Sequence, residues 1–394
     1  IHDHLGGGFH RYAVDRTWHL SHFEKMLYDQ AQLATSYLEA HQLRPEPLWE
    51  QVARDTLDYV LADLLDSDSG AFCSAEDADS PVAPDSDQRA EGAFYVWRQA
   101  EIDALLGEIA PLFSFHYGTR TEGNADDPHG ELTGKNVLHA MHSLQQTAER
   151  FGCATDQVRQ QLAEGRRRLS EARAQRARPH LDDKILTSWN GLIISALARG
   201  HQVLDEPRYL AAARRAADFV VGQLYDPDQR RLLRRFRAGQ AAFAGQLEDH
   251  AALISGLLDL YEAGFELRWL LVAEQLADRA IELFFDRAQG AFFATAGDDP
   301  SVLLRIKDDY DGAEPSGNAL ITCSLLRLGQ MLDRDDLVEA ARKTLRSFSS
   351  RLRRLPQVMP QMLVALDLSR TPTTQLVIVA ERDDPAARAL LRVI

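Results

Sequence analysis

The strongest constraint on the fold of this chain is a degenerate repeat that recurs where apolar segments end. The repeat reads LLDSDSGAF at 64–72, FFDRAQGAF at 284–292 and, more loosely, LYDPDQRRL at 224–232. Its aspartates, Asp66, Asp226 and Asp286, are separated by 160 and 60 residues. Repeats of this length indicate stacked supersecondary units.

Two kinds of helix are expected to alternate along the chain. Amphipathic segments, with apolar residues three and four apart, lead into the repeats at 49–65, 209–225 and 269–285. Segments that are apolar on nearly every face lie at 191–204, 251–263 and 319–332, with a more polar version at 26–40. A helix that is apolar all round is buried. The alternation therefore predicts an all-α fold with an inner and an outer layer of helices, an (α/α)6 toroid with about five to six helical pairs.

The toroid is expected to cover residues 1–370, interrupted by a polar insertion and short helices within 73–180. The chain opens at Ile1 without a methionine, so we expect the first helices of the toroid to be missing. Residues 373–380 (TTQLVIVA) predict a strand, and a helix is expected from about Pro385. Because one strand and one helix cannot form a core, residues 371–394 are expected to begin a small, truncated α/β appendage.

Composition excludes several kinds of partner. With 59 acidic and 44 basic side chains, the net charge of −15 repels phosphate backbones and anionic lipids. The arginines within 166–178 alternate with Glu164 and Glu171 and indicate a solvated helix face. No apolar run approaches the ~20 residues that span a bilayer. Three scattered cysteines without C-x-x-C indicate a reducing compartment, so we expect a cytoplasmic protein. From the charge and the short apolar runs, we expect that it binds neither nucleic acid nor membranes.

Candidate chemistry gathers at the expected starts of the inner helices. Parallel inner helices bring their N-terminal ends, with unpaired N–H groups, to one mouth of a toroid. At the first start, Ser21 and Glu24 match a capping box that would begin a helix near His22. Lys25 and Asp29 are spaced for an i,i+4 ion pair. His22 is therefore a candidate for contact with a ligand.

The second start, residues 180–191 (HLDDKILTSWNG), sets the adjacent carboxylates Asp182 and Asp183 close to Trp189 and Asn190. Charges this near a buried helix must be paired or lie in a wet pocket. An aromatic face beside carboxylates suits a sugar, because C–H groups pack on the ring and hydroxyl groups donate to the carboxylates. The alternative is an N-cap with an ion pair, and both remain open.

Two further starts carry acidic groups. In the sequence Glu248-Asp249-His250, the aspartate is a natural N-cap, and the helix dipole would favour a neutral His250. In residues 308–318 (DDYDGAEPSGN), Asp311 and Glu314 have no evident structural task. These two carboxylates are therefore functional candidates.

Two loops also hold polar clusters. The stretch HDHLGGGFH at 2–10 contains side chains able to bind metal, but H-x-H alone is a weak signal, and no metal or other cofactor is predicted. Its glycine run lacks the G-x-G-x-x-G and Walker patterns. Residues 76–80 (EDADS) have D-x-D character without the rest of an EF-hand loop, and 91–97 (EGAFYVW) add aromatic surface.

Taken in order, these motifs resemble the spermatogenesis-associated protein 20 family of thioredoxin-domain-containing proteins. The resemblance rests on HDHLGGGFHRY at 2–12, HFEKMLYDQ at 22–30, GKNVL at 134–138, EPSGN at 314–318 and the segments 76–80, 91–97 and 182–191. It covers essentially the whole chain. It implies a six-hairpin toroid similar to N-acylglucosamine 2-epimerases and several glycoside hydrolases, which the family joins to an N-terminal thioredoxin-like domain absent from these residues. It also implies that the glycine run lines the toroid mouth.

A carbohydrate-processing enzyme is the first function open to such a chain. Epimerisation needs acid–base groups on opposite faces of a sugar, for which His22 and His250 are candidates, with His10 or His180 as substitutes. Hydrolysis needs two carboxyl groups, and the candidate pairs are Asp182 or Asp183 with Asp311 or Glu314. Candidate contacts to the substrate are His4, His10, Lys25, Tyr28, Asp77, Asp79, Tyr95, Trp97, Lys135, Asn136, Trp189, Asn190, Glu248 and Asn318.

A non-catalytic module is the second function open to it. The toroid would bind a glycan or a protein and present it to the thioredoxin-like domain of the full-length chain. This hypothesis predicts ligand binding without turnover, and the binding should survive joint replacement of His22 and His250.

Overall fold

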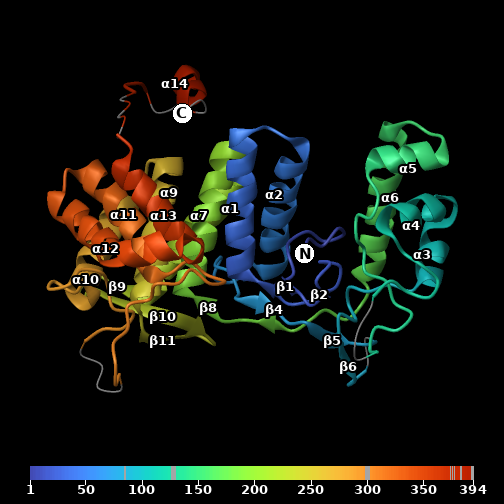
Figure 1. Ribbon diagram of the computed structural model, residues 1–394, viewed down its shortest axis with the longest axis horizontal. Coiled ribbons are helices and arrows are strands. Elements are labelled where there is room, and N and C mark those ends of the chain that lie inside the picture. Colours follow the sequence, from blue (N-terminus) through green and yellow to red (C-terminus); the bar gives the residue numbers. More distant parts are fainter. Residues whose placement is uncertain are drawn as a thin grey trace. The chain divides into compact units, whose positions relative to one another are not determined.

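Two compact units make up the chain. The computed structural model describes residues 1–83, 86–125, 130–297, 302–372, 374, 376, 378–381 and 384–391 (Figure 1). The first unit consists of Ile1–Met26, Asp58–Leu64 and Ser74–Asp182. The second unit consists of Leu27–Leu57, Leu65–Cys73 and Asp183–Ile394.

The second unit is built from helical hairpins in two layers. Its inner helices, each packed on the next, are α1 (Leu27–Leu43), α7 (Thr187–Leu204), α9 (Leu247–Gly264), α11 (Gly317–Leu332) and α13 (Pro360–Arg370). The outer helices that pack on α7, α9 and α11 in turn are α8 (Pro207–Leu224), α10 (Leu267–Phe284) and α12 (Asp335–Arg354). Helix α2 (Pro47–Tyr59) follows α1. This repeated pairing of inner and outer helices confirms the predicted all-α fold of toroid type.

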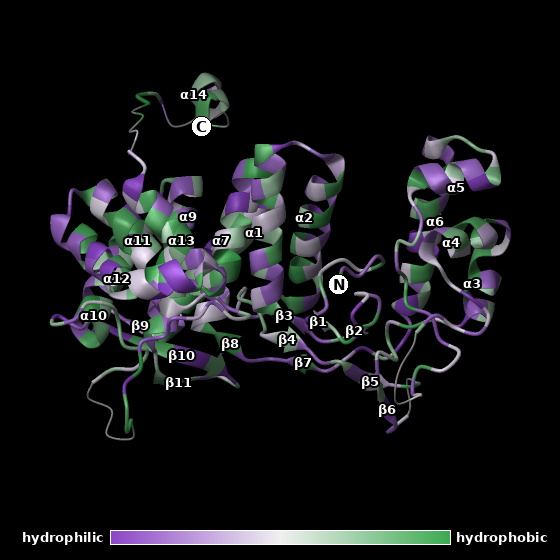
Figure 2. Ribbon diagram, viewed as in Figure 1, coloured by the Kyte–Doolittle hydropathy of each residue, from purple (hydrophilic) through white to green (hydrophobic). Residues whose placement is uncertain are grey.

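Burial follows the two layers. Inner helix α9 buries nearly every residue from Leu247 to Leu260. Outer helix α12 instead buries one stripe at three- and four-residue spacing: Leu337, Ala340, Ala341, Thr344, Leu345, Phe348 and Leu352. Its remaining residues are mostly polar, as the mixed colours of the helix show in Figure 2. The apolar positions along each helix are therefore the positions that the fold buries.

Two glycines let inner helices α7 and α9 touch through their backbones. A Cβ atom at Gly191 would lie 2.5 Å from the carbonyl carbon and oxygen of Ala252. A Cβ atom at Gly256 would lie 2.3 Å from the carbonyl oxygen of Gly191. No side chain fits at either position without moving a helix, so these glycines set the distance between the two helices.

The repeated turns are fastened by asparagines of the inner helices. Asn190 in α7 accepts a hydrogen bond from the N–H of Phe72 and donates to its carbonyl oxygen, both at 2.9 Å. Asn318 in α11 makes the same two bonds with Phe292, at 2.8 and 2.9 Å. Each phenylalanine ends one copy of the repeat. The repeat therefore marks the place where an outer helix is tied to the following inner helix.

The third copy of the repeat makes the same kind of turn around Asp226 and then continues into a small sheet. Strand β10 (Arg231–Arg237) pairs antiparallel with β9 (Tyr225–Asp226), β11 (Gln240–Ala244) and β8 (Ile185–Leu186). Arg235 is opposite Leu186, the residue just before α7. This pairing holds β10 beside the start of α7.

The first unit combines short helices with short strands. Its helices are α3 (Gln99–Leu106), α4 (Ala110–Tyr117), α5 (Leu144–Phe151) and α6 (Thr155–Arg173), with single turns at Val60–Leu64 and Gly107–Ile109. Its strand pairings are β1 (Tyr12–Ala13) with β2 (Ser21–His22), β3 (Lys25–Met26) with β4 (Ala75–Glu76), β4 with β7 (Leu181–Asp182), and β5 (Asp79–Pro81) with β6 (Arg89–Glu91). Its helices pack around a core that includes Trp97, Phe113 and Leu162.

The first predicted helix start was wrong. Ser21 and His22 form strand β2, Lys25 and Met26 form β3, and α1 begins only at Leu27. The expected capping box fails because this stretch pairs with other strands.

Parts of the tail lie outside the described residues. Residues 373, 375 and 377 of the predicted strand are among them, and the described residues between 374 and 380 form no strand. Helix α14 (Pro385–Leu391) begins where a helix was expected. The expected domain limits at 1–370 and 371–394 stay a prediction. In the described part of the chain, no helix has the length and apolar character needed to cross a membrane.

Candidate functional site

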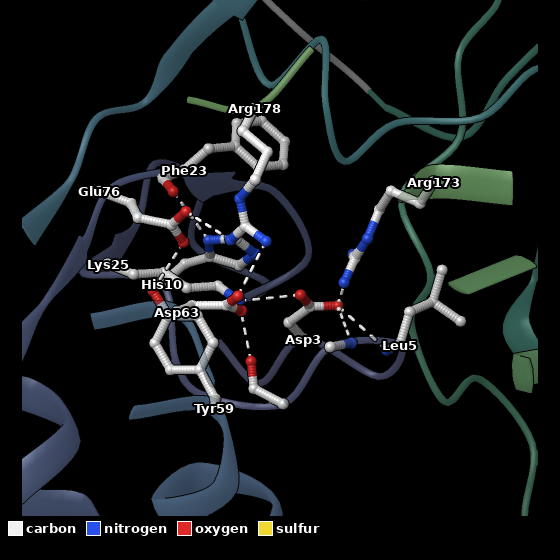
Figure 3. A network of polar contacts seen from close by, with 12 residues as sticks. Asp3, Leu5, His10, Phe23, Lys25, Tyr59, Asp63, Glu76, Arg173 and Arg178 are labelled. Atoms are coloured by element: carbon white, nitrogen blue, oxygen red, sulfur yellow. Dashed lines mark hydrogen bonds and ion pairs between the residues drawn. The ribbon is translucent and has the colours of Figure 1, made fainter. Parts of the chain in front are cut away.

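A buried ion cluster in the first unit joins the opening loop to α6 (Figure 3). Lys25 Nζ donates to Asp3 Oδ2 and to the carbonyl oxygen of Gly7, both at 2.8 Å. Arg173 Nη1 donates to Asp3 Oδ1 at 2.9 Å, and all three charged side chains are buried. Burial opposes the ionisation of Asp3, but Arg173 and Lys25 hold its pKa well below the usual range. Asp3 therefore stays ionised between two cations.

A second carboxylate extends this cluster. Tyr59 Oη donates to Glu76 Oε2 at 2.7 Å, and Arg178 Nη2 donates to Glu76 Oε1 at 2.6 Å. Arg178 Nη1 also lies 2.8 Å from Asp63 Oδ1, and Lys25 Nζ lies 4.2 Å from the centre of the Tyr59 ring. The whole cluster contains three cations and three carboxylates. Such balance fits a structural role, because each buried charge has a partner.

These contacts correct two expectations. Lys25 pairs with Asp3 rather than with Asp29, because it lies in a strand, where the i,i+4 spacing of a helix does not apply. Arg173 was expected on a solvated face and is instead buried. The more exposed arginines of α6 near Glu164 do form surface ion pairs.

Four of the five early histidines line one small cavity in the first unit. The cavity has a volume of about 30 Å³, and its polar lining includes His2, His4, His10, His19, Tyr95 and Arg173. Burial lowers the pKa of His2 to about 3 and that of His4 to about 4, so both rings are neutral at pH 7. His10 Nδ1 lies 3.0 Å from the carbonyl oxygen of Phe23. No three side chains among the described residues are arranged to hold a metal ion.

His22 does not line this cavity and is held between two carboxylates. Its Nδ1 lies 2.6 Å from Glu91 Oε1, and its Nε2 lies 3.3 Å from Glu24 Oε2. The ring stacks on Tyr12 with the two centroids 4.9 Å apart. The side chain is 23% exposed. The catalytic role of His22 stays a prediction.

A polar cluster in the second unit forms at the N-terminal ends of α7 and α9, beside the segment that leads into α11. Trp189 Nε1 donates to Glu314 Oε2 at 2.7 Å, and the Trp189 ring meets the Tyr28 ring edge-on, with centroids 4.8 Å apart. Arg234 of β10 forms an ion pair with Glu248. Burial raises the pKa of Glu314. We call this group of residues the helix-end cluster; its members are Tyr28, Trp189, Arg234, Glu248, Asp249 and Glu314.

Asp249 is the fully buried acid of the helix-end cluster. Its Oδ2 accepts a hydrogen bond from the Gln246 N–H at 2.9 Å and lies 3.4 Å from Arg234 Nη1, and the Ser188 N–H also faces the carboxyl group. Its Oδ1 has no regular hydrogen bond to any described residue. Burial raises the pKa of Asp249 to about 7, so this group can exchange a proton near neutral pH. The expected N-cap role was wrong, because Gln246 is the N-cap and Asp249 completes a capping box.

Two predicted catalytic residues are held by main-chain groups. His250 Nδ1 lies 2.9 Å from the Gln246 carbonyl oxygen, and burial lowers the pKa of His250 to about 4. Asp311 accepts hydrogen bonds from the N–H groups of Ser316 at 2.8 Å and Gln361 at 2.9 Å. Both side chains therefore have structural tasks, and their catalytic roles stay predictions.

The remaining candidates are scattered. Asn136 bonds to main-chain groups of Trp97 and Arg120, much as Asn190 and Asn318 fasten the repeated turns. Asp183 forms an ion pair with Arg237 at 2.6 Å. The candidates that lie in the first unit's strands and loops are Asp77, Asp79, Lys135, His180 and Asp182. Of the predicted residues, the helix-end cluster thus brings together Tyr28, Trp189, Glu248 and Glu314.

Sequence reasoning missed Arg234 and did not give Asp249 a chemical role. Arg234 lies in the stretch RLLRRFR, in which nothing distinguishes one arginine from the next. Its partners Glu248 and Asp249 follow only after a second strand and a turn, so the ion pairs appear only in the folded chain.

The fold and the helix-end cluster define an α-hairpin protein of toroid type. A sugar epimerase from a ruminal bacterium shares this fold with a TM-score of 0.53 and 9% sequence identity, covering 90% of this chain and 67% of that one. At this identity the likeness shows the fold alone.

Relatives in sequence match this chain along nearly its whole length. Spermatogenesis-associated protein 20 of Homo sapiens is 42% identical over 415 residues, which cover 100% of this chain and 52% of the relative. An uncharacterized protein of Caenorhabditis elegans is 35% identical over 399 residues, covering 97% and 54%. The chain is similar over its whole length to members of the spermatogenesis-associated protein 20 family, as its motifs indicate, and spans about half the length of these relatives. No protein-family model matches it.

Proposed function

We propose that the helix-end cluster binds a carbohydrate and performs acid–base chemistry on it. The observation that carries this proposal is the Asp249 carboxyl group, fully buried, with one oxygen free of regular hydrogen bonds among the described residues and a pKa of about 7. A general acid or base is most effective when its pKa lies near the working pH. Asp249 meets that requirement.

The neighbours of Asp249 supply the groups that a sugar needs. Trp189, half-buried and packed edge-on against the buried Tyr28 ring, offers aromatic surface for C–H groups, and Glu248 and Glu314 are acceptors for hydroxyl groups. The N-terminal ends of α7 and α9 add main-chain N–H groups. The fold shared with a sugar epimerase supports a carbohydrate ligand but does not by itself determine the chemistry.

Two reactions are compatible with this arrangement. In an epimerisation, Asp249 would remove or return the proton at a carbon beside the carbonyl group of an open-chain sugar. In a hydrolysis, protonated Asp249 would donate to the leaving oxygen, while Glu314 or Glu248 would act as the second carboxylate.

Incubation of the chain with a panel of sugars in D2O separates these reactions. Deuterium at C2 indicates epimerisation, and new reducing ends indicate hydrolysis. Asp249→Asn should lower either rate by at least about 100-fold, in line with the loss of a general acid–base group. Asp335→Asn, at an exposed position in the first turn of α12, is the matched control and should keep the full rate. No turnover across the panel would contradict the catalytic proposal.

A non-catalytic binding module is the second candidate. The observation that favours it is that His250 and Asp311, two of the predicted catalytic groups, are occupied by main-chain contacts. In this case the toroid would bind a glycan or protein for a thioredoxin-like domain elsewhere in a longer chain. Sugar binding that is unchanged in Asp249→Asn, with no turnover, would favour this function.

A further inference from the structure

We infer that the helix-end cluster selects a sugar bearing a free ammonium group, a hexosamine, over neutral and anionic sugars. The inference rests on the proposed function, because it names the substrate class of the same site. It is carried by the charge balance of the cluster, by an unpartnered buried carboxylate oxygen and by the half-buried ring of Trp189 beside them.

Carboxyl groups outnumber cations in this cluster. Glu248, Asp249 and Glu314 all act electrostatically on one guanidinium group, that of Arg234. Asp308 adds a fourth carboxyl group facing Glu248. When these carboxyl groups are ionised, the single positive charge of Arg234 does not balance them, and the cluster carries a net negative charge. Carboxylates held together in this way attract a cationic ligand and repel an anionic one.

Arg234 is already engaged by two of these acids. It contacts Glu248 and Asp249, whereas Glu314 accepts a hydrogen bond from the neutral Trp189 N–H. Asp249 Oδ1, fully buried, adds an acceptor without a regular hydrogen bond among the described residues. Buried carboxylate oxygens are stabilised when a charged donor reaches them. An ammonium group supplies three such donors.

The half-buried ring of Trp189 favours the same ligand. A cation packs on the face of a tryptophan or tyrosine ring, and the C–H face of a sugar packs there as well. Trp189 is half-buried and held by Glu314, so its ring orientation is fixed beside the acidic groups. A hexosamine offers both an ammonium group and an apolar ring face, whereas an N-acetylated sugar has lost the charge and a uronate has reversed it.

Calorimetric titration of the full chain at pH 7 with D-glucosamine, D-glucose, N-acetyl-D-glucosamine and D-glucuronate tests this inference. Glucosamine should bind about tenfold more tightly than glucose, the value expected for a charge-assisted hydrogen bond, and added NaCl should reduce the difference. Glu314→Gln keeps an acceptor for Trp189 and should weaken glucosamine binding more than glucose binding, so that most of the preference for glucosamine is lost. Glu339→Gln, at an exposed position of α12, is the matched control and should change nothing.

The outcomes separate the inference from the proposed function. If glucose or N-acetylglucosamine is bound or turned over as well as glucosamine, the hexosamine inference is overturned and the carbohydrate site stands. Equal losses for all sugars in Glu314→Gln would also overturn it. If none of the four sugars binds, both proposals fail.

Discussion

Asp3 is the residue on which the first unit's buried charges depend. Its two oxygens accept from Lys25 and Arg173, which belong to strand β3 and helix α6. Without the carboxylate, two buried cations would remain beside each other. Removing one partner of a buried ion pair is more costly than replacing the whole group by apolar residues, because the remaining charge is uncompensated.

Asp3→Asn should therefore lower the free energy of unfolding by about 3–5 kcal/mol. The variant keeps the size of the side chain and removes only its charge. Urea denaturation at pH 7 measures the change. Asp156→Asn, which breaks the exposed pair between Asp156 and Arg159, should stay within about 0.5 kcal/mol of the wild type. Similar losses in both variants would show that the buried ion cluster contributes no more to the free energy of unfolding than an exposed ion pair.

The burial of Asp249 predicts how the free energy of unfolding depends on pH. Its pKa rises to about 7 on burial, so the folded state holds a proton that the unfolded state loses near pH 4. Between those values the folded chain binds more protons, and the free energy of unfolding falls as pH rises. The full effect is on the order of 4 kcal/mol.

In Asp249→Asn this contribution should disappear. The free energy of unfolding of the variant minus that of the wild type should be larger at pH 8 than at pH 5. The reason is that only the wild type must ionise a buried carboxyl group at the higher pH. Urea denaturation of both proteins at the two pH values measures this difference. A parallel pH dependence in the two proteins would mean that Asp249 titrates in the ordinary range.

The close contact between α7 and α9 positions the helix ends that form the helix-end cluster. Gly256→Ala places a methyl group where the Gly191 carbonyl oxygen lies, so the helices must separate. We expect a loss of about 1–3 kcal/mol in the free energy of unfolding, as for other overpacked sites. Gly222→Ala in α8, where a Cβ atom meets nothing within 4 Å, should instead stabilise by about 0.5–1 kcal/mol. A neutral Gly256→Ala would contradict the close packing of these helices.

The asparagine that fastens two of the three repeated turns is the second element-scale feature. Asn318→Ala would leave the N–H and carbonyl oxygen of buried Phe292 without partners. Each unsatisfied group costs about 1–3 kcal/mol, so a loss of about 2–4 kcal/mol is expected in thermal or urea denaturation. Gln289→Ala, at an exposed position in the same turn, should change stability by less than about 0.5 kcal/mol. Equal effects would show that the turn does not need the asparagine.

The sequence predicted the elements of the second unit well, because their stability comes from apolar spacing that is visible in one dimension. The inner helices expected at 191–204, 251–263 and 319–332 correspond to α7, α9 and α11. The start of α1 was misplaced, since a local capping pattern at Ser21 and Glu24 competes with strand pairing to residues near Ala75. Pairing between residues about 50 positions apart cannot be seen in the sequence around Ser21 and Glu24.

At the scale of the whole molecule, the chain returns to each unit more than once. The first unit draws on three separate segments, so its ion cluster joins residues as distant as Asp3 and Arg173. The fold class could be predicted because it follows from a repeated helical pattern. The candidate site could be predicted only in part: helix starts placed Trp189, Glu248 and Glu314, but the chemistry depends on which carboxyl group becomes buried.

The most direct test of the proposed acid–base site is the titration of Asp249 by ¹³C NMR in chain labelled at aspartate carboxyl groups. The Asp249 signal is assigned by its absence from Asp249→Asn. We predict that it titrates near pH 7 and that a saturating sugar shifts its titration. An Asp249 signal that titrates near pH 4 and does not respond to any sugar would contradict the account.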